Sequence, residues 1–178
     1  MSRPLADGPV PVKRADPPAA GDERAVLTGF LDYQRQTLLH KCAGLTPEQL
    51  LARACPPSEL CLLGLVRHLT EVEFGWLAAR FAGAEEVELY GPGDADLAVT
   101  EADEESVARA FARYAEQIRN SNAMVAAAEL DALTAQSHPG TGERFSLRWI
   151  LAHLIEEYAR HNGHADLIRQ AIDGSIGE

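Results

Sequence analysis

The chain has 178 residues, of which 46% are hydrophobic and 24% are charged. These proportions are ordinary for a globular protein with a real core, and the length allows one domain, or one domain with a tail. Sixteen basic residues against 27 acidic ones give a net charge of −11, which repels nucleic acid phosphates and anionic lipids. We therefore expect neither nucleic acid nor a membrane as a partner.

The apolar runs and the cysteines of the sequence indicate the expected location of the protein and the role of its thiols. The sequence contains no run of 18 apolar residues, and its N-terminus lacks the apolar core of a signal peptide, so we expect a cytoplasmic protein. Cys42, Cys55 and Cys61 are odd in number and show no C-x-x-C spacing. This favours small buried or semi-buried residues over a disulfide framework or a thiolate zinc site.

The first 20 residues differ from the rest of the chain. They contain five prolines and few apolar residues, which predicts a disordered or loosely draped arm with no fold of its own. Residues 21–178 are then expected to form one domain.

Helical periodicity begins after this arm. Apolar residues at three- and four-residue steps predict a helix over 22–42, followed by Gly44 as a stop. Thr46 with Pro47 predicts the start of a short helix over 46–52. After a Pro-Pro break, a second long helix is expected from Ser58 or a neighbour to near Gly83.

The second half of the chain begins with an acidic loop over 84–99, which lacks the spacing of a calcium loop. Thr100 and Asp103 resemble a capping box for a third long helix that runs to roughly Glu129. Residues 138–142 (HPGTG) are strongly turn-like and allow a short extended pair across them.

The fourth long helix is the most regular one. Ser146 is its expected N-cap, Gly174 its stop, and no proline interrupts residues 146–173. Its apolar stripe consists of Leu147, Ile150, Leu154, Tyr158, Ala165, Ile168 and Ile172. Four long helices without a strand pattern predict an all-α four-helix bundle. The long connections leave both simple up-down and crossover topologies open.

Two residues of this helix stand out as metal ligands. His161 lies within the apolar stripe and Glu157 lies one turn earlier, so their side chains point the same way and can share an ion. His164 follows on the same side. The motif is short and common, however, so by itself it favours an intrahelical pair between the two side chains.

A third candidate ligand lies on the second long helix. His68 is at the edge of its buried face, among small residues that include Gly64 and Gly75. Either the close approach of another helix or room for a ligand would explain these glycines. Bundles build metal sites from facing helices, and two imidazoles with one carboxylate suit zinc or another divalent ion with one position open.

The segments LVRHLTEVEFGW and SLRWILAHLIEEYARHNGHADLIRQAIDG resemble the two signature helices of the DinB/YfiT-like superfamily. They are most similar to its branch near the mycothiol-dependent maleylpyruvate isomerases and mycothiol S-transferases. The resemblance spans roughly residues 22–174 and is weak between the two helices.

The resemblance implies a four-helix bundle, often dimeric, with a divalent metal on His68, Glu157 and His161. Glutamate at position 157 matches the mycothiol isomerase type, whereas many members have histidine there. Many members continue with Arg-Gly-Gln where this chain has Asn162-Gly163-His164, so His164 is a fourth ligand, an alternative ligand or an outer group.

The leading functional hypothesis is a metal-dependent thiol transferase or isomerase. A divalent ion, Zn2+ first and Ni2+ or Mn2+ as alternatives, would activate a low-molecular-weight thiol such as mycothiol to attack a small-molecule electrophile. Three alternatives stay open: a non-enzymatic metal- or ligand-binding bundle, a metal-assisted hydrolase, and an interaction bundle with structural histidines. On this hypothesis His153, two turns from His161, is too far away to bind the same ion.

Overall fold

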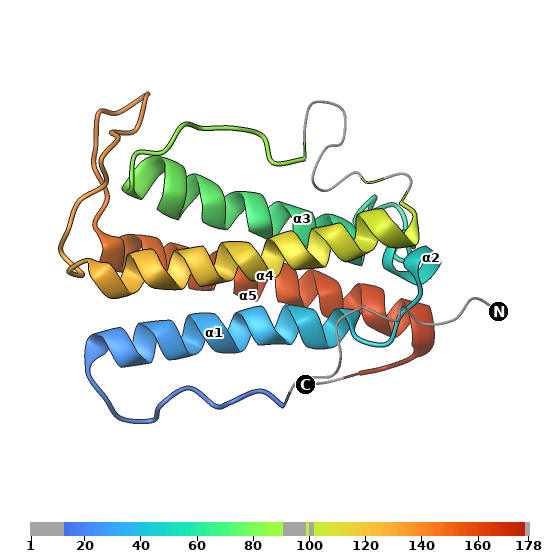
Figure 1. The fold of residues 1–178 in the computed structure, drawn as a ribbon. Coiled ribbons are helices and arrows are strands. Elements are labelled where there is room, and N and C mark those ends of the chain that lie inside the picture. Colours follow the sequence, from blue (N-terminus) through green and yellow to red (C-terminus); the bar gives the residue numbers. More distant parts are fainter. Residues whose placement is uncertain (1–12, 91–98, 100–101, 177–178) are drawn as a thin grey trace.

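A computed structural model describes residues 13–90, 99 and 102–176 of the chain. Four long helical segments and one short helix make up the secondary structure of these residues (Figure 1). In chain order they are α1 (Glu23–Cys42), α2 (Pro47–Leu50), α3 (Leu62–Glu73) continued by the π-helix η1 (Phe74–Phe81), α4 (Glu104–Ala127) and α5 (Leu147–Asp173). The all-α bundle predicted from the sequence is confirmed.

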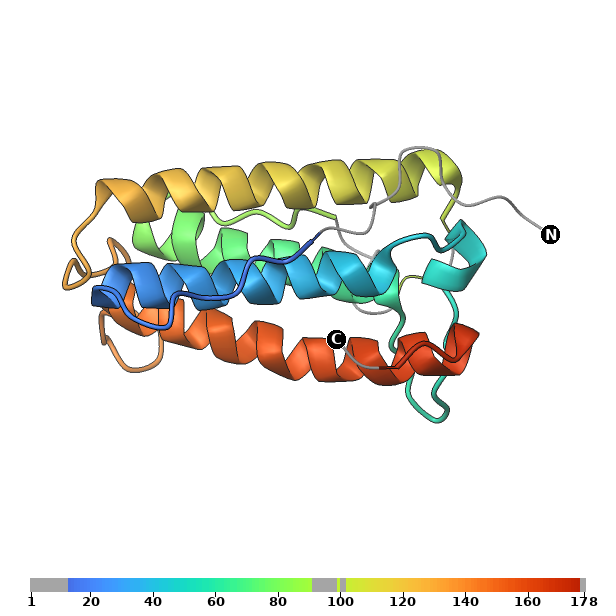
Figure 2. The same ribbon diagram turned by 90° about the horizontal axis from the view of Figure 1, so that it is seen from below.

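The long helices lie side by side in both views, which differ by a 90° turn, with α1 and α3 at opposite corners of the bundle (Figures 1 and 2). α1 and α5 run in one direction, whereas α3 and α4 run in the other. Because α3 and α4 are parallel, the connection between them must return along the length of the bundle. Of the two topologies that the sequence left open, the structure therefore has the crossover.

Local sequence signals set most helix ends where they were expected. Asp22, Thr46 and Ser146 each accept a hydrogen bond from a backbone N–H of the first turn that follows them. Gly174 ends α5 with φ +80°, a left-handed conformation that favours glycine. Asp103 caps α4, while Thr100, the other half of the predicted capping box, lies outside the described residues.

The second long helix begins later than predicted. Its N-cap is Cys61, whose Sγ accepts the N–H of Gly64, so Ser58 stays in the preceding loop. From Phe74 onwards the helix widens into a π-helix, which periodicity did not anticipate. π-Helical turns frequently accompany functional sites.

The segments outside the helices are short or extended. Across the predicted turn at 138–142 the extended pair is a single antiparallel bridge between Leu133 and Ser146. Residues 13–20 have no helix or strand, and Arg14 donates to Thr37 Oγ1 on α1 at 3.0 Å. No helix among the described residues is long and apolar enough to cross a membrane.

A buried ion pair joins the helices at mid-bundle. Arg35 on α1 donates from Nε and Nη2 to the two carboxylate oxygens of Glu73 on α3, each at 2.7 Å. Both side chains are almost fully buried. Tyr158 Oη on α5 donates to Glu73 Oε1 at 2.7 Å, and Asn122 on α4 accepts from Arg35 Nη1 at 2.7 Å. One network therefore ties all four long helices together.

Burial and charge fix the protonation of this network. Burial alone would lower the pKa of Arg35, but the charge of Glu73 and its hydrogen bonds outweigh burial and raise that pKa. Burial first, and the negative charge of Glu73 second, raise the pKa of Tyr158. Tyr158 therefore keeps its proton and acts as a donor to the carboxylate.

We predict that Glu73→Ala lowers the free energy of unfolding by about 3 to 5 kcal/mol, because it leaves the Arg35 charge buried without its main partner. Urea unfolding followed by circular dichroism measures the change. Arg109→Ala is the matched control: it removes an exposed pair with Glu105 on α4 and should cost less than about 0.5 kcal/mol. Similar losses in both variants would contradict the central role of the buried pair.

Candidate metal centre between α3 and α5

The three sequence-predicted ligands meet between α3 and α5. His68, Glu157 and His161 each offer a ligand atom, and these atoms lie within 4.8 Å of one another. The two imidazole rings have centroids 4.7 Å apart and meet edge to face. His161 is buried, at 7% exposed, whereas His68 and Glu157 are half-buried. Tertiary packing thus brings together residues from helices that are far apart in the sequence, and leaves one side of the group reachable from solvent.

Glu157 contacts a histidine on each side. Its Oε2 lies 3.6 Å from His161 Nε2, and its Oε1 lies 3.7 Å from His153 Nε2. His153 does not belong to the group that contains His68, but it forms a second candidate group with Glu156 and Glu157. The sequence-based prediction placed His153 too far from His161 to bind the same ion. It did not include the contact between His153 and Glu157.

His164 lies on the outer side of His161. The Nδ1 atoms of the two rings are 3.3 Å apart, while Nε2 of His161 is the nitrogen that faces Glu157. His164 is not part of either candidate metal group among the described residues. Its position suits an outer group that holds the His161 ring, as partners of metal-binding histidines usually do.

The neighbours of the candidate ligands fix the rotation of α5. Tyr158, next to Glu157, is anchored to Glu73 of α3. Asn162, next to His161, donates from Nδ2 to the backbone oxygen of Gln34 at 2.9 Å and to its Oε1 at 2.7 Å. Gln34 thus provides two hydrogen-bond acceptors at the contact between α1 and α5. With both neighbours held, the ligands are turned towards α3.

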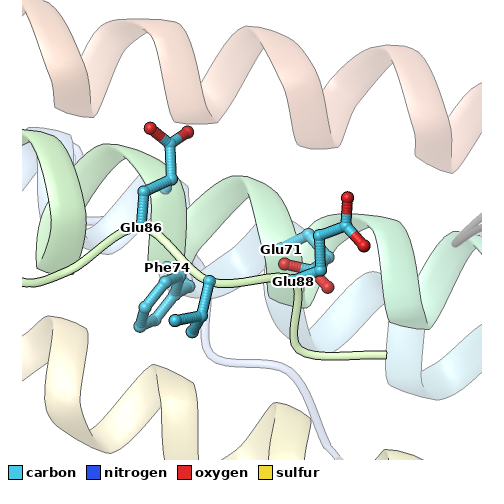
Figure 3. A pocket seen from close by; sticks show the side chains of 6 residues that line it. Glu71, Phe74, Glu86 and Glu88 are labelled. Carbon is cyan, nitrogen blue, oxygen red and sulfur yellow. The ribbon is translucent and has the colours of Figure 1, made fainter. Parts of the chain in front are cut away.

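The glycine at position 75 does not serve close helix packing, one of the two explanations that the sequence left open. A Cβ built on Gly75 would meet nothing within 4 Å. Gly75 instead lines a hollow of about 430 Å3 with Glu71, Phe74 and residues 86–88 (Figure 3). Glu71 Oε1 accepts the backbone N–H groups of Leu89 and Tyr90, which holds the segment 84–90 against α3. The candidate metal ligands His68, Glu157 and His161, called the triad below, are not among the residues that line this hollow.

Aromatic rings follow the same α3–α5 seam beyond His153. Trp76 on η1 lies 4.8 Å from the His153 ring and 5.2 Å from that of Trp149, centroid to centroid. Trp149 stacks on His153 at 5.0 Å, and Phe145 packs against Trp149 at 4.4 Å. The spacing of Trp149, His153, Glu157 and His161 at four-residue steps was the signal that places these residues in one row.

Two of the three thiols of the chain are poorly suited as nucleophiles. Burial raises the pKa of Cys42 to about 12, and it also raises the pKa of Cys61. Both are buried and free, and Cys55 is half-buried. The expectation of small buried or semi-buried residues therefore holds for all three cysteines.

Comparison with known proteins identifies the family. The family model described as Mycothiol-S-transferase matches residues 26–174, which is most of the chain. The chain belongs to the mycothiol S-transferase family. The matched range contains His68, Glu157 and His161 and agrees with the resemblance noted in the two signature helices. A search of curated proteins found no match.

Membership in this family makes the chain a relative of mycothiol-dependent transferases, with a small molecule as the expected substrate class. The His/Glu/His group gives it a candidate metal site of the kind that such an enzyme needs.

We predict that native protein at pH 8 reacts with an aromatic disulfide reagent at Cys55 only, because the buried thiols stay protonated and out of reach. Absorbance of the released thiolate should report one reactive group per native chain and all three after unfolding in guanidinium. Cys55→Ser should abolish the native reaction. Rapid labelling of Cys42 in the folded protein would contradict this.

Proposed function

We propose that this protein is a metal-dependent mycothiol S-transferase, with a divalent ion held by His68, Glu157 and His161. The observation that carries the proposal is the meeting of two imidazoles and one carboxylate within 4.8 Å across the α3–α5 seam. Membership in the mycothiol S-transferase family supports mycothiol as the thiol.

The donor set fits a first-row divalent ion. Two neutral imidazoles and one carboxylate are the protein ligands of many catalytic zinc sites, which keep a further position for water or substrate. Zn2+ is therefore the ion we propose, with Ni2+ and Mn2+ as alternatives that imidazole and carboxylate donors also accept. The half-buried His68 and Glu157 leave that further position open to solvent.

For an alkyl or aryl halide as the electrophile, the transfer reaction is a substitution of the halide by the mycothiol sulfur. The thiol proton leaves to the buffer, the mycothiol sulfur forms a bond to carbon, and the halide departs with the electron pair of the broken bond. A divalent ion in this position would lower the pKa of a thiol brought to it, which raises the nucleophile concentration at neutral pH.

The surrounding residues of the chain orient the ligands. His164 lies against Nδ1 of His161, which leaves Nε2 directed towards Glu157. Glu157 is flanked on its other side by His153. Tyr158 and Asn162 hold the α5 backbone against α3 and α1. The ligands are thus positioned before any ion binds, which reduces the conformational entropy lost on binding.

For the metal we predict one zinc equivalent per wild-type chain and none in His161→Ala, measured by mass spectrometry on protein purified without a metal-affinity column. His164→Gln should still bind zinc, but its zinc affinity in a chelator competition should fall by about 10- to 100-fold. The substitution alters an outer hydrogen-bond partner of His161 and not a ligand. His138→Ala changes a histidine of the 138–142 turn and should bind zinc as the wild type does. An unchanged zinc content in His161→Ala would refute the site.

For the activity we predict that the zinc-loaded protein accelerates the reaction of mycothiol with 1-chloro-2,4-dinitrobenzene above the spontaneous rate, followed by absorbance of the thioether. His161→Ala should fall to the spontaneous rate, and His138→Ala should match the wild type. Ester hydrolysis without thiol would favour the metal-assisted hydrolase instead. A zinc-loaded protein without thiol-dependent turnover across a panel of electrophiles would favour a non-enzymatic metal-binding bundle.

Three sequence-based expectations stay predictions beside this proposal: a homodimer, a cytoplasmic location, and the division into an arm over 1–20 and a domain over 21–178.

A further inference from the structure

The aromatic platform, formed by Trp76, Phe145, Trp149 and His153, is a continuous set of rings at one end of the α3–α5 seam. Each ring has a centroid within 5.3 Å of at least one other ring of the set. The rings come from η1, from the segment before α5 and from the first two turns of α5.

The platform is continuous with the candidate metal centre. His153 belongs to the platform, and its Nε2 lies 3.7 Å from Glu157 Oε1. Trp149, His153 and Glu157 follow one another at four-residue steps along one side of α5. At a rise of 1.5 Å per residue, Trp149 is therefore about 12 Å from Glu157 along the helix axis. A molecule bound at the candidate metal ligands that extends about 12 Å along the seam therefore reaches Trp149.

The outer part of the platform is open to water. Trp149 is 43% exposed, and the other three rings of the platform are half-buried. The guanidinium of Arg80 lies over the ring of Trp76, 4.9 Å from its centroid, so a group with hydrogen-bond donors adjoins the aromatic surface. A partly exposed aromatic surface with donors beside it suits a ligand that has both C–H faces and oxygen acceptors.

We propose that the aromatic platform binds the sugar and inositol rings of mycothiol while its thiol lies at the triad. Mycothiol carries its cysteine on a glucosamine linked to inositol, an uncharged and hydroxyl-rich unit. The C–H faces of such rings pack on indole, and their hydroxyl groups accept hydrogen bonds from a guanidinium. The separation of thiol and rings in an extended cysteinyl chain is comparable to the two helical turns between Glu157 and Trp149. This inference rests on the proposed function and names the site's specificity surface.

Two other occupants would use the same surface. An aromatic electrophile would stack on Trp149 in place of the sugar, and a second copy of the chain would cover the exposed indole. Each predicts a different response to the same substitution, so one set of variants separates them.

The kinetic test compares mycothiol with N-acetylcysteine, which keeps the thiol and lacks the rings. For Trp149→Ala we expect KM for mycothiol to rise roughly 3- to 10-fold, the effect of losing one aromatic contact. The ratio of kcat/KM for mycothiol to that for N-acetylcysteine should fall by the same factor, and Trp149→Phe should recover most of it. Phe30→Ala is the matched control, because Phe30 is an aromatic residue of similar exposure, 45%, on α1.

An unchanged ratio in Trp149→Ala overturns the proposal. A raised KM for the electrophile assigns the platform to that substrate instead, and a changed sedimentation coefficient with an unchanged ratio assigns it to a second copy.

A binding test separates failure of this proposal from failure of the proposed function. Both tryptophans of the chain, Trp76 and Trp149, belong to the platform, so intrinsic fluorescence reports on it selectively. Mycothiol should change the fluorescence to saturation in wild type and, more weakly, in His161→Ala, whereas N-acetylcysteine at equal concentration should change it much less. Saturable binding without turnover would refute only the transferase. Turnover with mycothiol but with no fluorescence response and an unchanged Trp149→Ala ratio would refute only the platform.

Discussion

The bundle depends on the buried ion pair between Arg35 and Glu73. A bidentate pair of this kind recovers the desolvation of both charges only when the remaining hydrogen-bonding positions are filled, and here Tyr158 and Asn122 fill them. Apolar side chains would pack the same helices at several rotations with little difference in energy. The ion pair allows one arrangement, because any rotation that separates Glu73 from Arg35 leaves a buried charge unpaired.

The same network positions the candidate metal centre without belonging to it. Tyr158 is held by Glu73, and Asn162 is held by Gln34, so the adjacent residues Glu157 and His161 have their direction set by the core. Glu73 is also the last residue of α3, where the regular helix ends and the π-helix begins. The widened turns shift Trp76 relative to a regular α-helix and place it opposite His153 and Trp149. Glu73 therefore supports the candidate ligands through Tyr158 and also marks the start of the π-helix that places Trp76.

The seam between α3 and α5 combines two kinds of chemistry in sequence. At its centre lie the nitrogen and oxygen atoms that could hold an ion, and towards the start of α5 lie the rings of the aromatic platform. His153 belongs to both, since its ring stacks on Trp149 and its Nε2 approaches Glu157. Cys42 and Cys61 are not part of this seam chemistry, because burial keeps both thiols protonated.

Local signals in the sequence were enough to determine the long helices and most of their ends, because caps and stops act within one turn; the start of α3 and its π-helical continuation were not predicted. Asp22, Ser146 and Gly174 occupy the positions that their side chains or left-handed backbone favour, and the period of α5 placed His161 among its buried residues. The pairing of Glu157 with His161 is likewise local. Tertiary structure decided the rest: the partnership of His68 with that pair, the placement of His164 behind His161, and the role of Glu73. These depend on which helices are neighbours and how each is rotated, and both are fixed by the energy of packing and of the buried charges rather than by residues close in sequence.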